Sequence, residues 1–455
     1  MKSWAYDIAK SGPNPVLFFS GFALDPVLAG RKLHADFGST VAVNLPLTKR
    51  RAPRKFVITK ERPLAQQVLR DTGSFNTVGV ALTRGPKHTA QRRLRNGVVR
   101  MNGPQQKELR RAYSPPLTKA CIHGVEQKIA DVCAAEVETW PRDTTFIVDD
   151  LADRLARRNA VEILFRGRDP ERAMHIANRI AHHSRLQYSL RNFLFPFDFP
   201  GMPYHALLRF AEETESDLIR WIEDCGPSDP SLVGCIAGLP SVGCEVTDAR
   251  QRAAQLWTLF GASFETIGTT LRWAICHLAW NKDVQGLLRE EANEKESASA
   301  YLKSFVLECL RLTPPVAYQF RRPTSDIEFN FTPVSRRDHI LINAAEINRD
   351  PDTFSRPDEI NLERWLTKAP SPMEPLAFSA GPRRCLGFNF AMSVLEHAIA
   401  EICRTGTIDI SDTQKIGTRL AITQGPVGVR LSLRASRRAP RSCRFRGGAR
   451  RQMSA

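Results

Sequence analysis

The sequence predicts a mainly α-helical protein with a minor antiparallel β-sheet and one long central helix. Apolar residues recur with the 3.6-residue period of amphipathic helices over most of the chain, whereas the alternation typical of strands is confined to short segments. The segment 249–280 is apolar nearly all round, which is typical of a buried helix. These observations favour a protein in which helices dominate and the sheet is small.

The predicted elements follow one another along nearly the whole chain. Periodicity predicts helices over 61–71, 105–113, 125–140, 150–165, 172–186, 204–223, 249–280, 300–312 and 389–404. Alternation predicts strands over 40–45, 55–59, 327–331, 340–343 and 427–433. Because the chain shows no internal repeat and no linker-like tract, we expect one domain over 1–433 with β-rich and α-rich lobes, followed by a tail over 434–455.

The predicted helix over 249–280 would be about 45 Å long at about 1.5 Å per residue, enough to cross the molecule. A transmembrane span is the alternative reading of so apolar a segment. Glu265 and Arg272 lie in the middle of it, however, where lipid would penalise both charges. We therefore expect the central helix of a soluble protein with no integral membrane segment.

The chain of 455 residues carries a formal net charge of +17, and the distribution of that charge matters more than its sum. The segment 434–455 contains eight arginines and no acidic residue, and it lacks apolar periodicity. We interpret it as a disordered, solvated extension in preference to a segment that binds nucleic acid or an anionic surface. A residual basic surface on the rest of the chain would suit an acidic redox partner.

Ten cysteines are scattered along the chain without a C-x-x-C pair or a histidine cluster at zinc spacing. These patterns exclude zinc-binding and thioredoxin-like functions. The first residues do not have the pattern of a leader peptide, so we expect a reduced, cytoplasmic setting. Most of the cysteines are then expected to be small, buried hydrophobic residues.

One cysteine lies in a different setting, the loop Phe378-Ser-Ala-Gly-Pro-Arg-Arg-Cys-Leu-Gly387. Gly381 and Gly387 permit a tight turn in which backbone amides approach the sulfur of Cys385, while the arginines and the following helix supply positive potential. Such surroundings favour a thiolate, the form of cysteine that ligates metals. The alternative is a buried structural cysteine, the usual place of a lone cysteine.

The pattern Phe-x-x-Gly-x-Arg-x-Cys-x-Gly resembles the haem-binding signature of the cytochrome P-450 family at every fixed position. The resemblance implies the fold of that family, with the long central helix over a haem b group. It implies that Cys385 is the axial ligand of the haem iron, that Phe378 packs against the ligand loop, that Gly387 belongs to the haem-binding loop and that Arg383 binds a haem propionate. A thiolate ligand pushes electron density to the iron and so favours O–O cleavage.

A second motif of the family lies upstream, in Glu308-Cys-Leu-Arg311. Residues i and i+3 share one face of a helix, so these two side chains can pair. Alone, the motif would be read as a surface ion pair worth little energy. The family pattern closes the pair into a triad, and Arg364 occupies the third place. The resemblance thus implies a structural role for Glu308, Arg311 and Arg364 behind the haem.

An acid next to an alcohol, Glu265-Thr266, lies in the middle of the long apolar helix. Polar groups there are costly unless partners or water satisfy them, which indicates a function. In the family pattern the pair holds water and relays protons to iron-bound dioxygen, although Ser263 and Ile267 replace a common glycine and a frequent second hydroxyl. The alternative is that Thr266 only bonds back to its own helix and Glu265 pairs with a distant arginine.

The resemblance implies two further propionate contacts, Arg110 and Arg321. Arg110 belongs to a helix followed by prolines, as in the family, although Gln106 replaces the usual Trp or His four residues before it. Arg92, in a segment that retains the histidine as His88, is the alternative for the role of Arg110.

By resemblance, the chain is an NAD(P)H-dependent monooxygenase that inserts one atom of O2 into a small hydrophobic substrate by hydroxylation or epoxidation. No flavin or ferredoxin signature is present, so electrons would come from separate proteins, which in bacterial members are usually a ferredoxin and its reductase. We expect a monomer with no nucleic-acid partner. A peroxygenase, a haem-thiolate isomerase and a catalytically impaired haem-binding protein remain as alternatives. Four phenylalanines suggest an apolar entrance, although core packing explains them about as well: Phe193, Phe195, Phe197 and Phe199.

Overall fold

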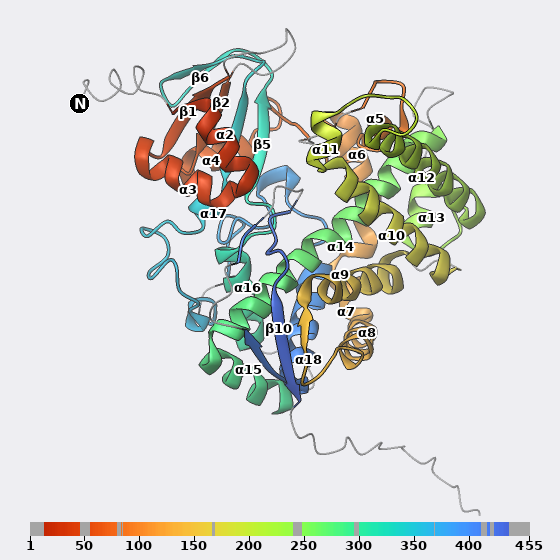
Figure 1. Cartoon of the computed structure of the whole chain (residues 1–455), viewed down its shortest axis with the longest axis vertical. Helices are drawn as coiled ribbons and strands as arrows, with labels where there is room; N and C mark the ends of the chain where they lie inside the picture. Colours follow the sequence, from red (N-terminus) through yellow and green to blue (C-terminus); the bar gives the residue numbers. More distant parts are fainter. Residues whose placement is uncertain are drawn as a thin grey trace, which may run out of the picture.

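A helix-rich lobe and a smaller lobe that holds most of the β-structure make up the protein, shown as a computed structural model in Figure 1. The structure describes residues 13–45, 55–79, 83, 85–165, 169–239, 248–294, 300–367, 369–410, 416–418 and 423–435. The α-helices are α2 (Pro15–Leu24), α3 (Pro26–Phe37), α4 (Arg62–Arg70), α5 (Ala90–Arg93), α6 (Pro104–Tyr113), α7 (Lys119–Gly124), α8 (Glu126–Glu138), α9 (Val148–Asn159), α10 (Pro170–Gln187), α11 (Leu190–Leu194), α12 (Pro203–Cys225), α13 (Leu232–Ala237), α14 (Asp248–Trp280), α15 (Lys282–Glu294), α16 (Ala300–Leu312), α17 (Ala344–Ile347) and α18 (Phe388–Thr405).

Short helical turns and ten strands complete the described chain. The turns are η1 (Pro115–Leu117), η3 (Leu362–Trp365) and η4 (Gly381–Arg383), together with the π-helical segment η2 (Ala160–Phe165). The strands are β1 (Thr40–Asn44), β2 (Lys55–Thr59), β3 (Phe75–Thr77), β4 (Thr145–Ile147), β5 (Tyr318–Pro323), β6 (Ile327–Phe329), β7 (Thr332–Val334), β8 (His339–Asn343), β9 (Gly406–Ile410) and β10 (Arg430–Ala435). The mainly helical fold predicted from the sequence is confirmed.

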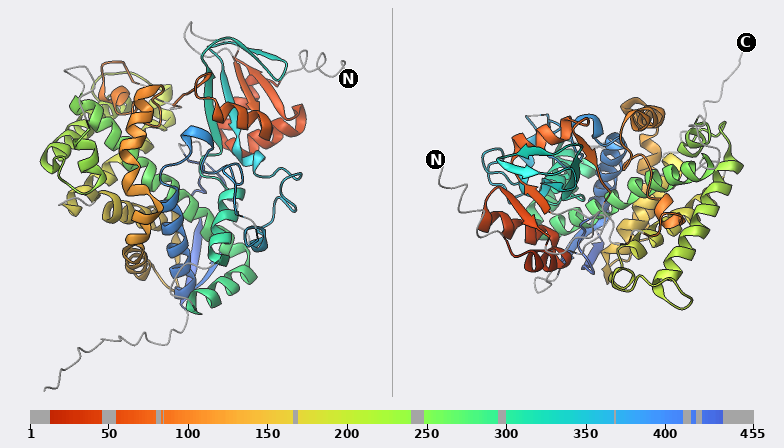
Figure 2. Two further views of the ribbon diagram at one scale, coloured as in Figure 1. Left: turned by 180° about the vertical axis from the view of Figure 1, so that it is seen from behind. Right: turned by 90° about the horizontal axis from the view of Figure 1, so that it is seen from above.

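The long helix α14 passes through the middle of the helix-rich lobe in every view (Figures 1 and 2). Its 33 residues include Phe260 and Leu271, which are fully buried, and α9, α10, α12, α16 and α18 all pack against it. The surrounding helices thus bury their apolar faces against this central helix. Among the residues that the structure describes, no helix is long and apolar enough to span a bilayer.

The first two helices, α2 and α3, were not predicted from the sequence, and in α2 the residues Ser20 and Gly21 interrupt the apolar run. Both helices start at a proline that follows a capping residue. The Asn14 side chain accepts hydrogen bonds from two backbone amides of α2, and the Asp25 side chain does the same for α3. A capping residue followed by proline at the first helical position is a strong signal for the start of a helix. Its stabilising effect exceeds the loss of helix propensity caused by one interior glycine.

The sheets are small, and the larger one has the strand order β1-β2-β8-β5-β3. Every pairing in it is antiparallel except β2 with β8, which run parallel, so the expectation of an antiparallel sheet needs this one correction. A second sheet has the order β4-β10-β9, and β6 pairs with β7. Strand β10 ends at Ala435, two residues beyond the predicted domain limit, and the rest of the predicted tail lies outside the described residues.

Two of the hydrophobic clusters show how the lobes meet. The largest cluster is built mainly on α8, α9, α14, α16 and α18, and a separate cluster joins α4 to the larger sheet. Loop residues that follow α17 and precede α18 run between these clusters, and Leu376 and Ala380 of that stretch are buried in the second one. The segment that leads to Cys385 is therefore held by the β-rich lobe, while the helix after it belongs to the helical core.

Candidate active site around Cys385

The loop before α18 is shaped by two backbone features around Cys385. The amide of Cys385 donates a hydrogen bond to the carbonyl oxygen of Phe378 at 2.8 Å, which closes the loop. Gly381 has a φ of +68°, and a Cβ atom there would lie 2.6 Å from the carbonyl oxygen of Leu69. Only glycine fits at this position, because both the left-handed backbone and the close approach of α4 exclude a side chain.

Aromatic packing joins the loop to the start of α18. The rings of Phe378 and Phe388 meet edge to face with their centroids 4.7 Å apart. The guanidinium of Arg384 lies over the Phe388 ring, 4.8 Å from its centroid. This packing fixes the start of α18 against the loop and so fixes the position of the sulfur between them.

Cys385 is exposed as a residue, but the electrostatic setting of its thiol differs from the sequence-based expectation. Burial raises the pKa of the thiol above its ordinary value, and the Gly387 amide, Arg110 and Arg384 offset this only in part. The surroundings alone therefore do not produce a thiolate, because desolvation penalises the charged form more than the neighbouring groups favour it. A bound metal cation reverses this balance, since a coordinating thiol is deprotonated outright.

Three arginines gather beside the ligand loop. Arg110 donates from Nη2 to the carbonyl oxygen of Arg384 at 2.5 Å, and Arg383 donates from Nη2 to the side chain of Asn102 at 2.7 Å. Desolvation followed by repulsion from Arg110 lowers the pKa of Arg383 to about 10. Desolvation followed by repulsion from Arg383 lowers the pKa of buried Arg321 to about 10. The Arg383 guanidinium is therefore near enough to be repelled by Arg110 and to repel Arg321.

This arginine cluster suits an anionic group with two carboxylates. Within the described part of the chain, no carboxylate forms an ion pair with Arg110, Arg321 or Arg383, and Nε of Arg383 is buried without a hydrogen-bond partner. Clustered cations of this kind are stabilised by an anion that accepts charge-assisted hydrogen bonds. A cysteine next to such a cluster fits haem, because Cys385 would ligate the iron and the arginines would bind the propionates.

The alternative propionate segment lies elsewhere. Its helix α5 is held on α12, where the amide of Ala90 donates to Glu212 at 2.6 Å and Arg93 donates from Nε to Glu215 at 2.8 Å. Arg110, in contrast, reaches the ligand loop directly. The geometry thus favours Arg110 over Arg92 as the partner of a group bound at Cys385. Gln106, one turn earlier on α6, is buried.

The predicted triad is formed, and Glu308 is its centre. Arg311 donates two hydrogen bonds to the Glu308 carboxylate, at 2.8 and 2.9 Å, and Nε of Arg364 donates a third at 3.0 Å. Glu308 and Arg311 have no exposed side-chain surface. A fully buried carboxylate is stable only when its oxygens are satisfied in this way. The triad ties α16 to η3, the turn that carries Arg364.

Three members of this cluster were not recognised from the sequence. The backbone amide of Asn361 and Nε1 of Trp365 each donate to Glu308 at 2.9 Å. The ring of Phe354 lies between cations, with the guanidinium carbons of Arg311 and Arg364 at 5.3 and 5.6 Å from its centroid. An aromatic residue so placed stabilises cations through its π face. The available signal was that these residues lie in the same short stretch as Arg364.

The acid and alcohol of α14 have separate partners. The hydroxyl of Thr266 donates to the carbonyl oxygen of Ala262 at 3.1 Å, so the back-bonded arrangement considered as an alternative is the one observed. Glu265 is half-buried, and its side chain forms a hydrogen bond with Ser184 of α10. Desolvation raises the pKa of Glu265 to about 7, with smaller contributions from Ser184, Asp153, Arg185 and Arg272. Glu265 is thus placed to gain or lose a proton near neutral pH.

Replacing Glu265 with glutamine is expected to stabilise the fold at pH 8. The pKa of about 7 lies above the ordinary 4.5, so the folded state binds the proton more tightly and stability falls as pH rises between these values. At pH 8 the cost reaches up to about 3 kcal/mol, and Glu265→Gln removes it. Urea unfolding at pH 4.5 and pH 8 measures the difference, which should be near zero at the lower pH.

A matched control for this substitution is Glu136→Gln. Glu136 is 1% exposed and is paired with Arg154 and Arg158, so its loss should lower the free energy of unfolding at pH 8. A Glu265→Gln protein that is less stable than the wild type at pH 8 would show that the folded state favours the charged carboxylate.

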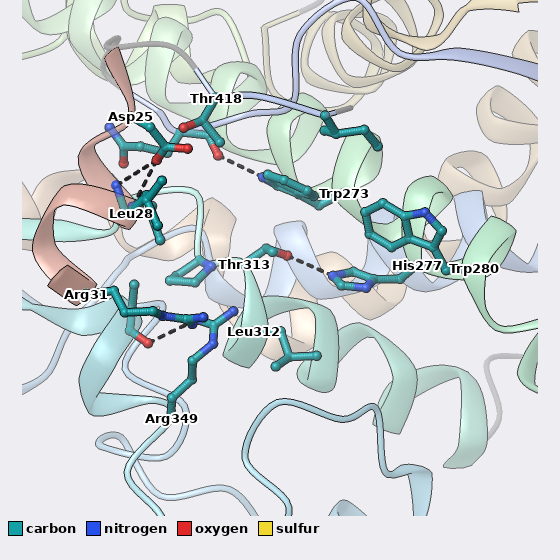
Figure 3. A pocket seen from close by; sticks show the side chains of 15 residues that line it. Asp25, Leu28, Arg31, Trp273, His277, Trp280, Leu312, Thr313, Arg349 and Thr418 are labelled. Carbon is teal, nitrogen blue, oxygen red and sulfur yellow. Dashed lines mark hydrogen bonds between the residues drawn. The ribbon is translucent and has the colours of Figure 1, made fainter. Parts of the chain in front are cut away.

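A separate cavity of about 300 Å³ lies away from Cys385 (Figure 3). Trp273, Trp280 and His277 form one side of it, and Arg31 and Arg349 lie on another. Burial lowers the pKa of His277 to about 4, so this ring is neutral near pH 7. None of the residues that line this cavity belongs to the ligand loop, the arginine cluster or the triad.

A cysteine beside an arginine cluster, a buried triad and a long helix bearing an acid and an alcohol are the features expected of a haem-thiolate oxidoreductase. Comparisons with known proteins agree with this class. The family model described as cytochrome P-450 matches residues 245–426, which include Glu265, Glu308 and Cys385. The chain is 25% identical over 453 residues to cyclooctatin synthase of Streptomyces melanosporofaciens, covering 94% of this chain and 95% of that protein.

Solved structures show the same fold. A cyanobacterial protein with bound retinoic acid, CYP120A1, has a TM-score of 0.74 at 17% identity, covering 90% of this chain and 94% of its own. CYP175A1 from Thermus thermophillus has a TM-score of 0.72 at 19% identity, covering 92% and 97%. The chain belongs to the cytochrome P-450 family. It is a haem-thiolate monooxygenase that uses haem iron, dioxygen and redox partners.

Proposed function

We propose that this monooxygenase inserts one atom of dioxygen into a small hydrophobic substrate, by hydroxylation or epoxidation. Its electrons would come from NAD(P)H through a separate ferredoxin and ferredoxin reductase, and its cofactor would be haem b. The balanced reaction consumes substrate, O2, NAD(P)H and one proton, and yields oxygenated product, water and NAD(P)+. The observation that carries the proposal is the convergence of three arginines without acidic partners on the loop of Cys385.

The residues around the site have distinct roles in this proposal. Cys385 would ligate the iron, and Arg110, Arg321 and Arg383 would bind the propionates, while Phe378 and Gly387 would hold the ligand loop. Glu308, Arg311 and Arg364 would maintain the wall behind the cofactor. When bound, the haem supplies the iron at which dioxygen is reduced. Glu265 would hold and release the protons that this reduction consumes, and Thr266 would present its hydroxyl to water and oxygen.

A hydrophobic substrate is supported by the surface as well as by the relatives. Phe193, Phe195, Phe197 and Phe199, on and just after α11, are each about half exposed, with values from 48% to 53%. Exposed apolar residues grouped in this way mark binding or entry sites. One structural neighbour is described as retinoic acid bound and another as in complex with hexadec-9Z-enoic acid ligated acyl carrier protein, and both acids are largely hydrocarbon.

Separate redox partners are supported by the charge near the ligand loop. Lys107 and Arg111 are exposed on α6, the helix that carries Arg110, and Arg384 is exposed in the loop itself. Basic side chains in this position would attract an acidic partner and orient it. We further propose a monomer in the bacterial cytoplasm, with one domain over 1–433. The eight described cysteines are all free, which suits a reducing compartment.

The proposal is tested by turnover with labelled oxygen. Purified protein is incubated with NADPH, a surrogate ferredoxin with its reductase, 18O2 and a panel of small apolar compounds chosen by their effect on the haem absorption spectrum. We expect one 18O atom in the product and NADPH consumption that depends on the ferredoxin. Product formed with hydrogen peroxide but never with NADPH would identify a peroxygenase instead. Spectral changes without product under either supply would identify a haem-binding protein that lacks turnover.

A further inference from the structure

One face of α14 carries two charged residues, Glu265 and Arg272, with a glycine between them. Glu265, Gly268 and Arg272 are spaced by three and four residues, so they lie on one side of the helix. That side faces α9 and α10, because Glu265 bonds to Ser184 of α10 and Arg272 pairs with Asp153 of α9. This face thus forms a polar contact between three helices whose other contacts are largely apolar.

Asp153 is held directly against the α14 backbone by this arrangement. A Cβ atom on Gly268 would lie 2.6 Å from Oδ1 of Asp153, so any side chain at position 268 would displace the carboxylate. Nε of Arg272 lies 3.4 Å from Oδ1, and Nη2 of Arg185 lies 3.9 Å from Oδ2. The carboxylate of Asp153 therefore occupies a defined place, one helical turn from Glu265.

This polar contact runs from solvent to the interior. The side chain of Arg185 is 56% exposed, that of Asp153 is 20% exposed, and Glu265 is half-buried near the middle of α14. Side chains three residues apart on a helix have Cβ atoms about 5 to 6 Å apart. Since Asp153 Oδ1 lies close to where a Cβ of residue 268 would be, one water can bridge its carboxyl group to that of Glu265.

The charges that face the two carboxyl groups suit reversible protonation. Asp153 faces Arg272, Arg157 and Arg185, with Asp149 as the nearby acid, and desolvation outweighs these arginines and raises its pKa. Glu265 faces Ser184, Asp153, Arg185 and Arg272. The pKa of Tyr188 is raised mainly by desolvation, and Glu265 adds to this effect. Two neighbouring carboxyl groups with raised pKa values can exchange a proton at little cost near neutral pH.

We propose that Asp153 is a second proton-relay carboxyl group, which transfers protons from solvent at the outer side of α9 and α10 to Glu265. In each transfer, protonated Asp153 gives its proton to the Glu265 carboxylate through the bridging water, and the Asp153 carboxylate then takes a proton from bulk water. The inference rests on the proposed function, because Glu265 needs a proton supply only if dioxygen is reduced at the site. Asp153 acts only through Glu265 and does not itself contact the reacting atoms.

Two variants separate a relay from a structural ion pair. Asp153→Asn removes the titratable group at nearly constant volume, and Gly268→Ala displaces the carboxylate while every charged residue is retained. Glu136→Gln is the matched control, because Glu136 is also a carboxylate that pairs with arginines of α9, on a different contact of that helix. Glu265→Gln and the double variant Asp153→Asn/Glu265→Gln complete the series.

The holoenzymes are compared in two measurements that need no organic substrate. The NADPH consumed through the surrogate ferredoxin system is compared with the amounts of hydrogen peroxide and water formed. The measurement is made in H2O and in D2O. The protonation of Glu265 is followed between pH 5 and pH 9 by infrared difference spectroscopy of its carboxyl band. We expect water formation to fall about tenfold or more in Asp153→Asn, with a smaller fall in Gly268→Ala and a larger solvent isotope effect in both.

The Glu265 titration and the double variant exclude a purely structural role. Removing the negative neighbour should lower the titration midpoint of Glu265 in Asp153→Asn and leave it unchanged in Glu136→Gln. For a relay in series, the double variant should be no slower than Glu265→Gln alone. Unchanged water formation, an unchanged midpoint, or effects that multiply in the double variant would each overturn the relay. Wild-type protein that consumes no NADPH would instead overturn the proposed function.

Discussion

Replacing Glu308 with glutamine should cost about 3 to 5 kcal/mol of folding free energy and yield little haem-loaded protein. The carboxylate of Glu308 accepts five hydrogen bonds, from Arg311, Arg364, Asn361 and Trp365, at distances between 2.8 and 3.0 Å. The glutamine amide turns one acceptor into a donor that faces donors, and it leaves Arg311 buried without a counter-charge. Loss of one partner of a buried pair is among the most destabilising single changes.

Glu359→Gln provides the control for this prediction in the same stretch of chain. Its carboxylate pairs with Arg356, and both side chains are more than 60% exposed. An exposed pair of this kind contributes about 0 to 1 kcal/mol, so the control should express and bind haem like the wild type. Urea unfolding and the haem-to-protein absorbance ratio measure both variants. A Glu308→Gln protein with wild-type stability would show that the triad is not the support it is taken to be.

Replacing Cys385 with serine should reduce oxygenated product at least about 100-fold while the protein still folds. A loss of that size corresponds to about 2.7 kcal/mol of transition-state stabilisation at about 1.36 kcal/mol per tenfold. The physical reason is that serine does not donate electron density to iron as a thiolate does. Folding should survive, because Cys385 is exposed as a residue and its backbone bond to Phe378 is unchanged.

The control for the cysteine substitution is Cys121→Ser. Cys121 is also exposed and free, and it lies on α7 away from the loop. Product formation with a compound found in the turnover screen is compared at equal haem content, and thermal unfolding checks the fold of both variants. Equal activity of Cys385→Ser and the wild type would remove Cys385 from the chemistry.

The motifs predicted side-chain contacts better than they predicted electrostatics. Glu308, Arg311 and Arg364 meet as the resemblance to the family implied. The pKa of Cys385, by contrast, is raised, since it depends on how much of the thiol the rest of the protein desolvates. The desolvation of one atom depends on residues from all parts of the fold, so it cannot be predicted from the sequence of one loop.

Local signals also explain which elements were found. Helices α4, α6, α10 and α12 have apolar faces at helical spacing and were predicted within a few residues. Helix α15 and strand β5 were missed, because α15 is rich in charges and β5 contains two arginines in succession. Tertiary contacts stabilise these elements, as in the pairing of β5 with β8 and β3. The contact of Asp153 with Gly268 likewise joins positions more than a hundred residues apart.

The absorption spectrum of the reduced, carbon-monoxide-bound protein tests the central claim most directly, the ligation of haem iron by Cys385. The wild type should show the red-shifted band that a thiolate ligand produces, and Cys385→His should bind haem without that band. Cys121→Ser should keep the wild-type spectrum. A wild-type spectrum without the shift, or a shifted band that survives in Cys385→His, would contradict the assignment of Cys385 as the iron ligand.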